Sequence, residues 1–238
     1  METVKNKNVL IIGATGGIGS KTARLLAGSG ANLFLAARNE QKLTLLANEL
    51  HVPLSNTLAL DFSKPEEVQL LKDQFFLLYP TIDILVNAAG IGIIKATDEL
   101  SEVEFLKTLN YNLYAPFLLV KAFLPKMKEQ KKGLIINIPG VLGKVPMAGA
   151  AAYSASKYGL VGMMQSIREE VKRTEIRITN LFLGGVDTPF WDTIDLRVQR
   201  DKMVVAEEAA KAIWFLCQQP TSGVVSEMVI QPFNHQAI

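Results

Sequence analysis

The chain has 238 residues, of which 49% are hydrophobic, 20% charged and 8% aromatic. This length supports a sizeable core but is short for two full domains, so we expect one domain over residues 1–238. Lys and Arg total 25 and Asp and Glu total 23, which gives a net charge of +2. Because neither sign is in excess, charge does not dominate binding, which argues against a nucleic-acid partner.

Cys217 is the only cysteine, which excludes an intramolecular disulfide and a multi-cysteine metal site. Residues 1–8 lack the basic, apolar and small-residue order of a signal peptide, and no uncharged stretch is long enough to span a bilayer as a helix. His51 and His235 have no arrangement of carboxylates or cysteines nearby, so we expect surface histidines and no metal site. The sequence therefore predicts a cytoplasmic protein without a membrane partner.

Short runs rich in Val, Ile and Leu recur along the chain, and most are apolar throughout, as strands buried on both faces are. They cover residues 9–12, 33–36, 57–60, 84–86, 134–138, 178–183 and 224–230. Helical segments lie between them, and two have the sequence of a capping box, Ser63 with Glu66 and Ser101 with Glu104. This alternation predicts an α/β fold: a single doubly wound, Rossmann-type, mostly parallel seven-stranded sheet with helices on both faces. Its ligands should bind beyond the carboxyl ends of the strands.

The first strand runs into a glycine-rich turn over residues 13–19, after which helical periodicity begins. Gly13, Gly17 and Gly19 leave three and then one residue between them, which departs from the usual dinucleotide fingerprint. A glycine turn at this place lets backbone amides and a helix N-terminus face a pyrophosphate. Any tight turn from strand to helix favours glycine, but the position after the first strand strengthens the assignment.

The second strand ends at Ala37 and Arg38, where an enzyme that uses NAD places an acidic residue against the ribose 2′-hydroxyl. A guanidinium forms a paired hydrogen-bond fork with a 2′-phosphate, so the sequence favours NADP(H) over NAD. The alternative is a solvated arginine at a strand end. Asp61, after the third strand, either accepts the adenine amino group or caps the following loop.

Tyr153 and Lys157 are four residues apart, so on a helix both side chains project from one face. A phenol with a pKa near 10 is a poor acid at neutral pH, but an adjacent ammonium lowers its pKa. The pair therefore predicts a proton donor.

With these motifs the sequence resembles the short-chain dehydrogenase/reductase family over nearly its whole length. The resemblance rests on the glycine turn, on the stretch from Asn87 to Gly90, on Asn112, on the Tyr153 and Lys157 pair, and on residues 186–189. It implies that Tyr153 protonates a substrate carbonyl while hydride arrives from the nicotinamide, and that Lys157 holds the nicotinamide ribose.

The resemblance also implies the remaining roles. Val186 and Thr188 would contact the nicotinamide carboxamide, and Asn87 would brace the central sheet. The expected catalytic residues are Asn112, Tyr153 and Lys157. The expected cofactor residues are Gly13, Thr15, Gly16, Gly17, Ile18, Gly19, Arg38, Asp61, Phe62, Asn87, Ala88, Gly90, Tyr153, Lys157, Val186 and Thr188.

Asn112 lies in register with Leu109 and Pro116 on the apolar face of its helix, so its polar side chain needs a partner. Pro116 has no amide hydrogen, which leaves the carbonyl of Asn112 without its helical bond and free to bind water. In the family this is the proposed proton-relay water. The alternative is a helix kink with a satisfied core asparagine.

Position 140 breaks the family pattern, because members carry a serine thirteen positions before the tyrosine and this chain has Gly140. Losing a comparable oxyanion donor costs about 10² to 10³ in rate. A backbone amide of residues 139–141, a water or a group on the substrate are the possible replacements. Leu183 is a second departure, where the family commonly has proline.

Residues 189–204 mix Phe190, Trp191 and Ile194 with charges, which indicates either a lid over a pocket or a surface helix pair. Candidate pocket walls are Ile93, Leu142, Met147, Phe190 and Trp191. The leading hypothesis is an NADPH-dependent reductase of a mostly apolar ketone or aldehyde. One alternative, motivated by Gly140, is a cofactor-binding regulatory or scaffolding protein with weak or lost catalysis, and another is an enzyme that works chiefly as an alcohol dehydrogenase. The resemblance also implies a homodimer or homotetramer formed through the helices that contain Asn112 and Tyr153.

Overall fold

The computed structural model describes residues 2–220 and 222–234. These residues form a central parallel sheet in the order β3-β2-β1-β4-β5-β6-β9. Its strands are β1 (Asn8–Ile12), β2 (Asn32–Ala37), β3 (Thr57–Ala59), β4 (Ile84–Asn87), β5 (Lys132–Asn137), β6 (Glu175–Leu183) and β9 (Glu227–Ile230). The predicted doubly wound seven-stranded fold is confirmed.

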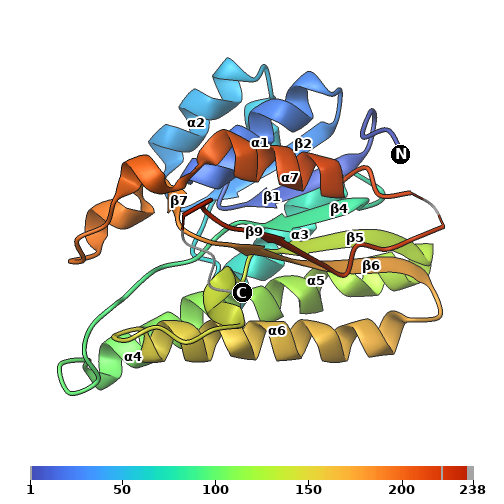
Figure 1. Cartoon of the computed structure of the whole chain (residues 1–238). Coiled ribbons are helices and arrows are strands. Elements are labelled where there is room, and N and C mark those ends of the chain that lie inside the picture. The colour runs from blue at the N-terminus through green and yellow to red at the C-terminus, as the bar shows by residue number, and fades with distance from the viewer. Residues whose placement is uncertain (1, 221, 235–238) are drawn as a thin grey trace.

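Helices cover both faces of this sheet (Figure 1). One face carries α1 (Gly17–Gly28), α2 (Glu40–Glu49) and α7 (Ala206–Leu216), and the other carries α3 (Pro65–Leu78), α5 (Ala115–Gln130) and α6 (Ala151–Val171). Helix α4 (Glu102–Leu109) continues into α5 through a π-helical turn, η2 (Asn110–Tyr114). The shorter elements are the 3₁₀ turns η1 (Leu54–Asn56), η3 (Val141–Gly143), η4 (Pro189–Thr193) and η5 (Arg200–Lys202), and the strand pair β7 (Val186–Asp187) and β8 (Val204–Val205).

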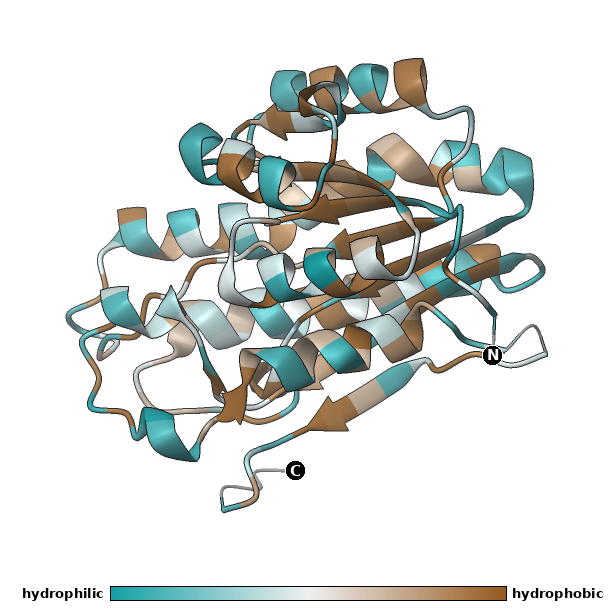
Figure 2. Cartoon of the chain, turned by 90° about the horizontal axis from the view of Figure 1, so that it is seen from above, coloured by the Kyte–Doolittle hydropathy of each residue, from teal (hydrophilic) through white to brown (hydrophobic). Residues whose placement is uncertain are grey.

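The core lies on both faces of the strands because their side chains alternate between two apolar layers. In β1, Val9 and Ile11 pack towards α1, α2 and α7, whereas Leu10 and Ile12 pack towards α3, α5 and α6, and all four are fully buried. Figure 2 shows the same pattern as hydrophobic strands enclosed by helices with hydrophilic outer faces. Burial on both faces explains why the strand sequences are apolar without alternation.

The two predicted capping boxes have different outcomes. Ser101 and Glu104 form the reciprocal bonds of a capping box at the start of α4, as predicted. The box at Ser63 is wrong: α3 begins at Pro65 after Lys64, and the Ser63 hydroxyl donates instead to Asp61. Proline fixes the first helical φ and needs no amide partner, which places the helix start one residue later than the box requires.

The edge strand β9 begins three residues later than the apolar run starting at Val224. The amide of Val225 donates to Gln219 Oε1 at 2.7 Å, and its carbonyl accepts from Thr179 Oγ1 at 2.6 Å. Side chains therefore take the groups that would otherwise pair with β6.

Cys217, directly after α7, is buried, and burial raises its pKa to about 12. Across the residues that the structure describes, no helix combines the length and the apolar character needed to cross a bilayer.

Candidate active site

The glycine turn after β1 is compact and packs on the loop that follows β4. Gly13 has a positive φ of 76°, and a Cβ placed there would lie 2.8 Å from the amide nitrogen of Ala89. A Cβ on Gly19 would lie 2.2 Å from the carbonyl oxygen of Gly13. Glycine is therefore required at both positions, by close approach of backbone to backbone.

The first turn of α1 is free to receive an anion. Gly16 is its N-cap and supplies no side-chain bond, so the first amides of α1, around Ile18, keep the unsatisfied donors that suit a pyrophosphate. Thr15 is partly buried beside this turn. A Cβ on Gly17 would lie 2.5 Å from Cγ2 of Thr188, which brings the expected nicotinamide loop against the expected phosphate turn.

Arg38 and Asp61 leave the ends of the neighbouring strands β2 and β3. Arg38 is exposed, and its guanidinium lies over the ring of Tyr111 with 5.3 Å between Cζ and the ring centroid. Asp61 Oδ1 accepts from the Ser63 amide and hydroxyl, so Asp61 does cap the following loop. Phe62 is buried beneath this loop. Tyr111 was not singled out by sequence reasoning, and its only signal was its place next to Asn112.

The loop after β4 runs between the two halves of the site. The amide of Ala88 donates to Ile12 of β1, and Asn87 Nδ2 donates to Asn137 Oδ1 of β5 at 3.4 Å. Asn87 thus links two strands, the arrangement expected of a bracing residue. A Cβ on Gly90 would lie 3.2 Å from Asn112 Oδ1 and 3.6 Å from Lys157 Nζ, so the glycine allows both side chains to approach.

Asn112 is buried in the π-helical turn η2 and is fully engaged through its side chain. Its Oδ1 accepts from the Ile91 amide at 2.9 Å, and its Nδ2 donates to the Ile91 carbonyl at 2.9 Å and to Ser156 Oγ at 3.2 Å. Ser156 donates in turn to the carbonyl of Tyr153 at 2.7 Å. The sequence left two interpretations open, a carbonyl that binds a relay water and a helix kink with a satisfied core asparagine. Neither included the π turn, which carries Asn112 into this network.

Tyr153 and Lys157 lie on one face of α6, as their spacing predicted. Lys157 Nζ lies 5.3 Å from the centroid of the Tyr153 ring and donates to the carbonyl of Ile138 at 3.1 Å. The amine is buried, which lowers the pKa of Lys157 to about 8. A buried amine held beside a phenol by a backbone carbonyl is a suitable partner for a proton donor.

The pKa of Tyr153 differs from the expectation. We expected the neighbouring ammonium to lower it, but burial raises the pKa of Tyr153 above its ordinary value. Desolvation disfavours the phenolate, and here it outweighs the ammonium at this separation. The hydroxyl is therefore protonated at neutral pH, the form that a proton donor needs.

Gly140, at the place of the absent serine, has φ of 70° and ψ of 171°. This region of backbone conformation is essentially restricted to glycine. A Cβ there would also lie 3.3 Å from the Leu183 carbonyl oxygen, and such a contact is tight. The backbone conformation of the turn therefore requires glycine at position 140. The difference from the family is more than the loss of a serine hydroxyl.

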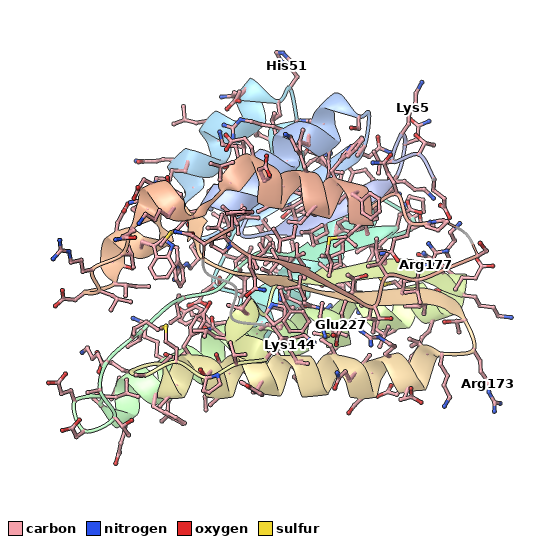
Figure 3. The ribbon with its side chains drawn as sticks, viewed as in Figure 1. Lys5, His51, Lys144, Arg173, Arg177 and Glu227 are labelled. Atoms are coloured by element: carbon pink, nitrogen blue, oxygen red, sulfur yellow. The ribbon has the colours of Figure 1, made fainter. Side chains whose placement is uncertain are left out.

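The turn after Gly140 is anchored to the edge of the sheet. Lys144 Nζ and Glu227 Oε2 of β9 form an ion pair at 2.6 Å, and the two side chains lie side by side in Figure 3. Lys144 Nζ also lies 4.4 Å from the ring centroid of Phe182. This anchor ties the turn between β5 and α6 to the neighbouring strands β6 and β9.

Val186 and Thr188, which are expected to contact the nicotinamide, are buried where β7 pairs with β8. Trp191 Nε1 donates to the Val186 carbonyl at 2.9 Å, so the indole is tied to this strand. Two short 3₁₀ turns, η4 and η5, lie within residues 189–204 in place of α-helices.

Phe190 packs against both the loop at Gly92 and the ring of Tyr153. A Cβ on Gly92 would lie 2.3 Å from Phe190 Cζ, and the Phe190 ring lies 6.1 Å from the Tyr153 ring between centroids. Arg200 ties this segment to β7 and to η4 through bonds of 2.6 Å to Asp187 and to Asp192. Phe190 thus packs against the expected proton donor.

His51 is exposed and points away from the molecule, as Figure 3 shows, and it takes no part in the site. His235 lies outside the described residues.

Comparison with known proteins identifies the family of this chain. The sequence matches the family described as short chain dehydrogenase over residues 7–198. It is 31% identical to an uncharacterized oxidoreductase of Staphylococcus saprophyticus over 98% of each chain. It is 32% identical to a putative ketoacyl reductase of granaticin polyketide synthase from Streptomyces violaceoruber, over 92% of this chain and 89% of the relative. The fold matches an alcohol dehydrogenase from Thermococcus sibiricus in complex with 5-hydroxy-NADP, with a TM-score of 0.89, 27% identity, and coverage of 98% of this chain and 100% of that one.

The chain belongs to the short-chain dehydrogenase/reductase family. It is therefore a member of an oxidoreductase family, and the resemblance predicted from the sequence is confirmed.

Proposed function

We propose that this protein is an NADPH-dependent reductase of a mostly apolar ketone or aldehyde. The observation that carries the proposal is the pair on α6: the Tyr153 ring is partly buried, and the buried amine of Lys157 lies 5.3 Å from its centroid. The bound dinucleotide would supply hydride to the carbonyl carbon. The Tyr153 hydroxyl then donates its proton to the carbonyl oxygen.

Lys157 has two proposed tasks. Its amine is held by the Ile138 carbonyl, where it can bind the nicotinamide ribose and restore the proton of Tyr153. Proton supply runs past Asn112, and Pro116, four residues later in the sequence, has no amide hydrogen to donate to its backbone carbonyl. A water bound at that carbonyl completes the proposed relay.

The cofactor preference rests on the adenosine end. Ala37 is buried at the end of β2, and Arg38 follows it in an exposed position. A guanidinium is a bidentate donor that suits a 2′-phosphate. The free amides of α1 suit the pyrophosphate, so these residues fit NADP(H) as a whole.

The preference for apolar substrates rests on the aromatic cover of the site. Phe190 and Trp191 pack edge to face with 5.5 Å between ring centroids, and Phe190 contacts the loop at Gly92. A substrate entering beside Tyr153 meets these rings, which favour apolar surface.

The test combines turnover with binding. Purified protein is incubated with NADPH and a panel of apolar ketones and aldehydes, and NADPH loss is followed by absorbance. Tyr153→Phe should lower turnover about 10²- to 10⁴-fold, the usual contribution of a positioned acid, and leave the Kd for NADPH unchanged. A wild-type protein that binds NADPH but reduces no carbonyl contradicts the proposal.

That outcome would favour the second candidate, a cofactor-binding regulatory or scaffolding protein. The observation behind it is Gly140, whose backbone conformation leaves no place for the family's serine. The intact Tyr153, Lys157 and Asn112 network favours the reductase over this candidate.

We also propose that the protein is cytoplasmic. We further propose that it self-associates into a homodimer or homotetramer. A groove of about 950 Å³ runs along α4, α5 and α6. Its wall includes Val103, Leu106 and Phe117, which are 75%, 63% and 40% exposed. A contiguous apolar surface of this kind is typical of an interface with a second copy.

A further inference from the structure

One aromatic side chain connects the two residues expected at the adenosine end of the cofactor. Tyr111 donates its hydroxyl to Asp61 Oδ2 at 3.0 Å, and its ring lies beneath the Arg38 guanidinium at 5.3 Å. Arg38 follows β2, Asp61 follows β3, and Tyr111 comes from η2 on the helical layer. A single residue therefore bridges two loops that are distant from it in sequence.

The hydrogen bonds of Asp61 leave room for one further donor. Oδ1 accepts from the Ser63 amide at 3.0 Å and from its hydroxyl at 2.7 Å, and Oδ2 accepts from Tyr111. A carboxylate offers about four acceptor positions, so one position on Oδ2 is left. Burial opposes ionisation, but the hydrogen bonds from Ser63 and Tyr111 lower the pKa of Asp61, which stays an acceptor at neutral pH. The group that fits is a planar amine donor such as the exocyclic amino group of adenine.

The contact with Arg38 restricts a side chain that is otherwise exposed. An arginine in water samples many rotamers, and ordering it on binding costs conformational entropy. The ring of Tyr111 offers a flat surface on which the guanidinium already rests. Its N–H groups then remain available at the edge for a phosphate.

We propose that Tyr111 is a positioning residue that prepares Asp61 for the adenine amino group and Arg38 for the 2′-phosphate, and so couples recognition of the base to recognition of the phosphate. This inference rests on the proposed use of NADP(H). It adds to that function a residue that sets both affinity and the discrimination between NADPH and NADH, through preorganisation of the free protein.

Two variants separate the two contacts. Tyr111→Phe removes the hydroxyl and keeps the ring, whereas Tyr111→Leu removes both. Kd values for NADPH and for NADH are measured by the fluorescence of the bound nucleotide, without any carbonyl present. Tyr158→Leu is the matched control, because Tyr158 is exposed on α6 and contacts neither Arg38 nor Asp61 among the described residues.

Each variant has its own expected result. Tyr111→Phe should raise the Kd for both nucleotides by the same factor of about 3 to 10, the value of one hydrogen bond. Tyr111→Leu should raise the Kd for NADPH by about threefold more, and that for NADH by no more, because only NADPH uses Arg38. In an Arg38→Ala background this extra effect on NADPH should disappear.

The outcomes also separate the inference from the function beneath it. If the wild-type protein binds neither nucleotide, the proposed function itself fails. If the wild-type protein binds NADPH and both Tyr111 variants bind it equally well while keeping the wild-type unfolding midpoint, only the role of Tyr111 is overturned. Tighter binding by Tyr111→Leu overturns it as well, because it means that the ring occludes the site.

Discussion

The Nζ of Lys157 donates a hydrogen bond of 3.1 Å to the carbonyl oxygen of Ile138, the residue directly before Pro139 and Gly140. This bond joins the helix that carries the proposed proton donor, Tyr153, to the turn from which the family's serine is missing. The same amine is buried beside the Tyr153 ring. One side chain thus fixes the relative position of the two parts of the site on which the chemistry depends.

The titration of Lys157 should be visible in stability. Its pKa is about 8 in the folded protein and 10.5 ordinarily, so between these values the unfolded chain binds more protons and stability rises with pH. Lys157→Met removes this titration. The difference in unfolding free energy between wild type and variant should therefore shift in favour of the wild type by about 2 kcal/mol from about pH 7.5 to 10, measured by urea denaturation. A difference that stays constant with pH contradicts the lowered pKa.

Gly140→Ser should not restore a stronger catalyst. A serine at a φ of 70° and ψ of 171° is strained, at a cost of about 1 to 3 kcal/mol in unfolding free energy. The strain should also move the turn, so turnover falls. Gly162→Ser, in the exposed middle of α6 with open space around it, is the control and should be neutral or slightly stabilising. A large rise in turnover in Gly140→Ser would show that the turn accepts a side chain.

Arg38→Ala tests the choice of cofactor. Loss of a charged donor pair should raise the Kd for NADPH about 10- to 100-fold and change that for NADH less than about threefold. Arg24→Ala removes an equal charge from α1, where Arg24 pairs with Glu49 on the surface, and should leave both values unchanged. Equal losses for both nucleotides in Arg38→Ala would place Arg38 away from the 2′-phosphate.

Arg200→Ala should loosen the cover over the site. Without the bonds to Asp187 and Asp192, residues 189–204 open more often, and thermolysin should cleave this segment several-fold faster. Arg197, exposed in the same segment and without an ion pair among the described residues, provides the control as Arg197→Ala. Apolar substrates should show a raised KM in Arg200→Ala alone, and identical cleavage of both variants would refute the anchoring role.

Leu106→Glu tests the apolar groove on α4, α5 and α6. A charge buried between two copies is costly, so the variant should run as a smaller species in light scattering coupled to gel filtration. Leu70→Glu on α3 is the control, since Leu70 is 55% exposed and lies outside the groove. Self-association that survives Leu106→Glu would point to another surface.

The strands and the catalytic spacing followed directly from the sequence because both depend on local patterns. Apolar runs locate strands such as β1 and β5, and the separation between Tyr153 and Lys157 places them on one helical face. These inferences need no knowledge of distant contacts.

The misses share a different cause, since each depends on a partner far along the chain. The start of α3 was misplaced because Ser63 is used by Asp61, and the start of β9 because Thr179 bonds to Val225. The pKa of Tyr153 has the opposite direction because burial, which the sequence did not quantify, outweighs the nearby amine.

Tyr111 and Gly140 show the same limit at the level of the site. No spacing rule connects Tyr111 to Arg38, because the contact arises from the π turn and the order of the strands. The positive φ of Gly140 is likewise invisible in a sequence that shows only a missing hydroxyl.

The thiol of Cys217, the only cysteine in the sequence, is a natural probe of local opening. Its thiolate is suppressed and shielded at the end of α7, which is tied to α1 through a 2.8 Å bond from Trp214 Nε1 to Ser29 Oγ. We therefore expect alkylating reagents to react faster with Cys217 when that helix opens locally. The labelling rate should report local opening of the helical layer that contains α7 and α1, next to the glycine turn over residues 13–19. This measurement needs no engineered probe.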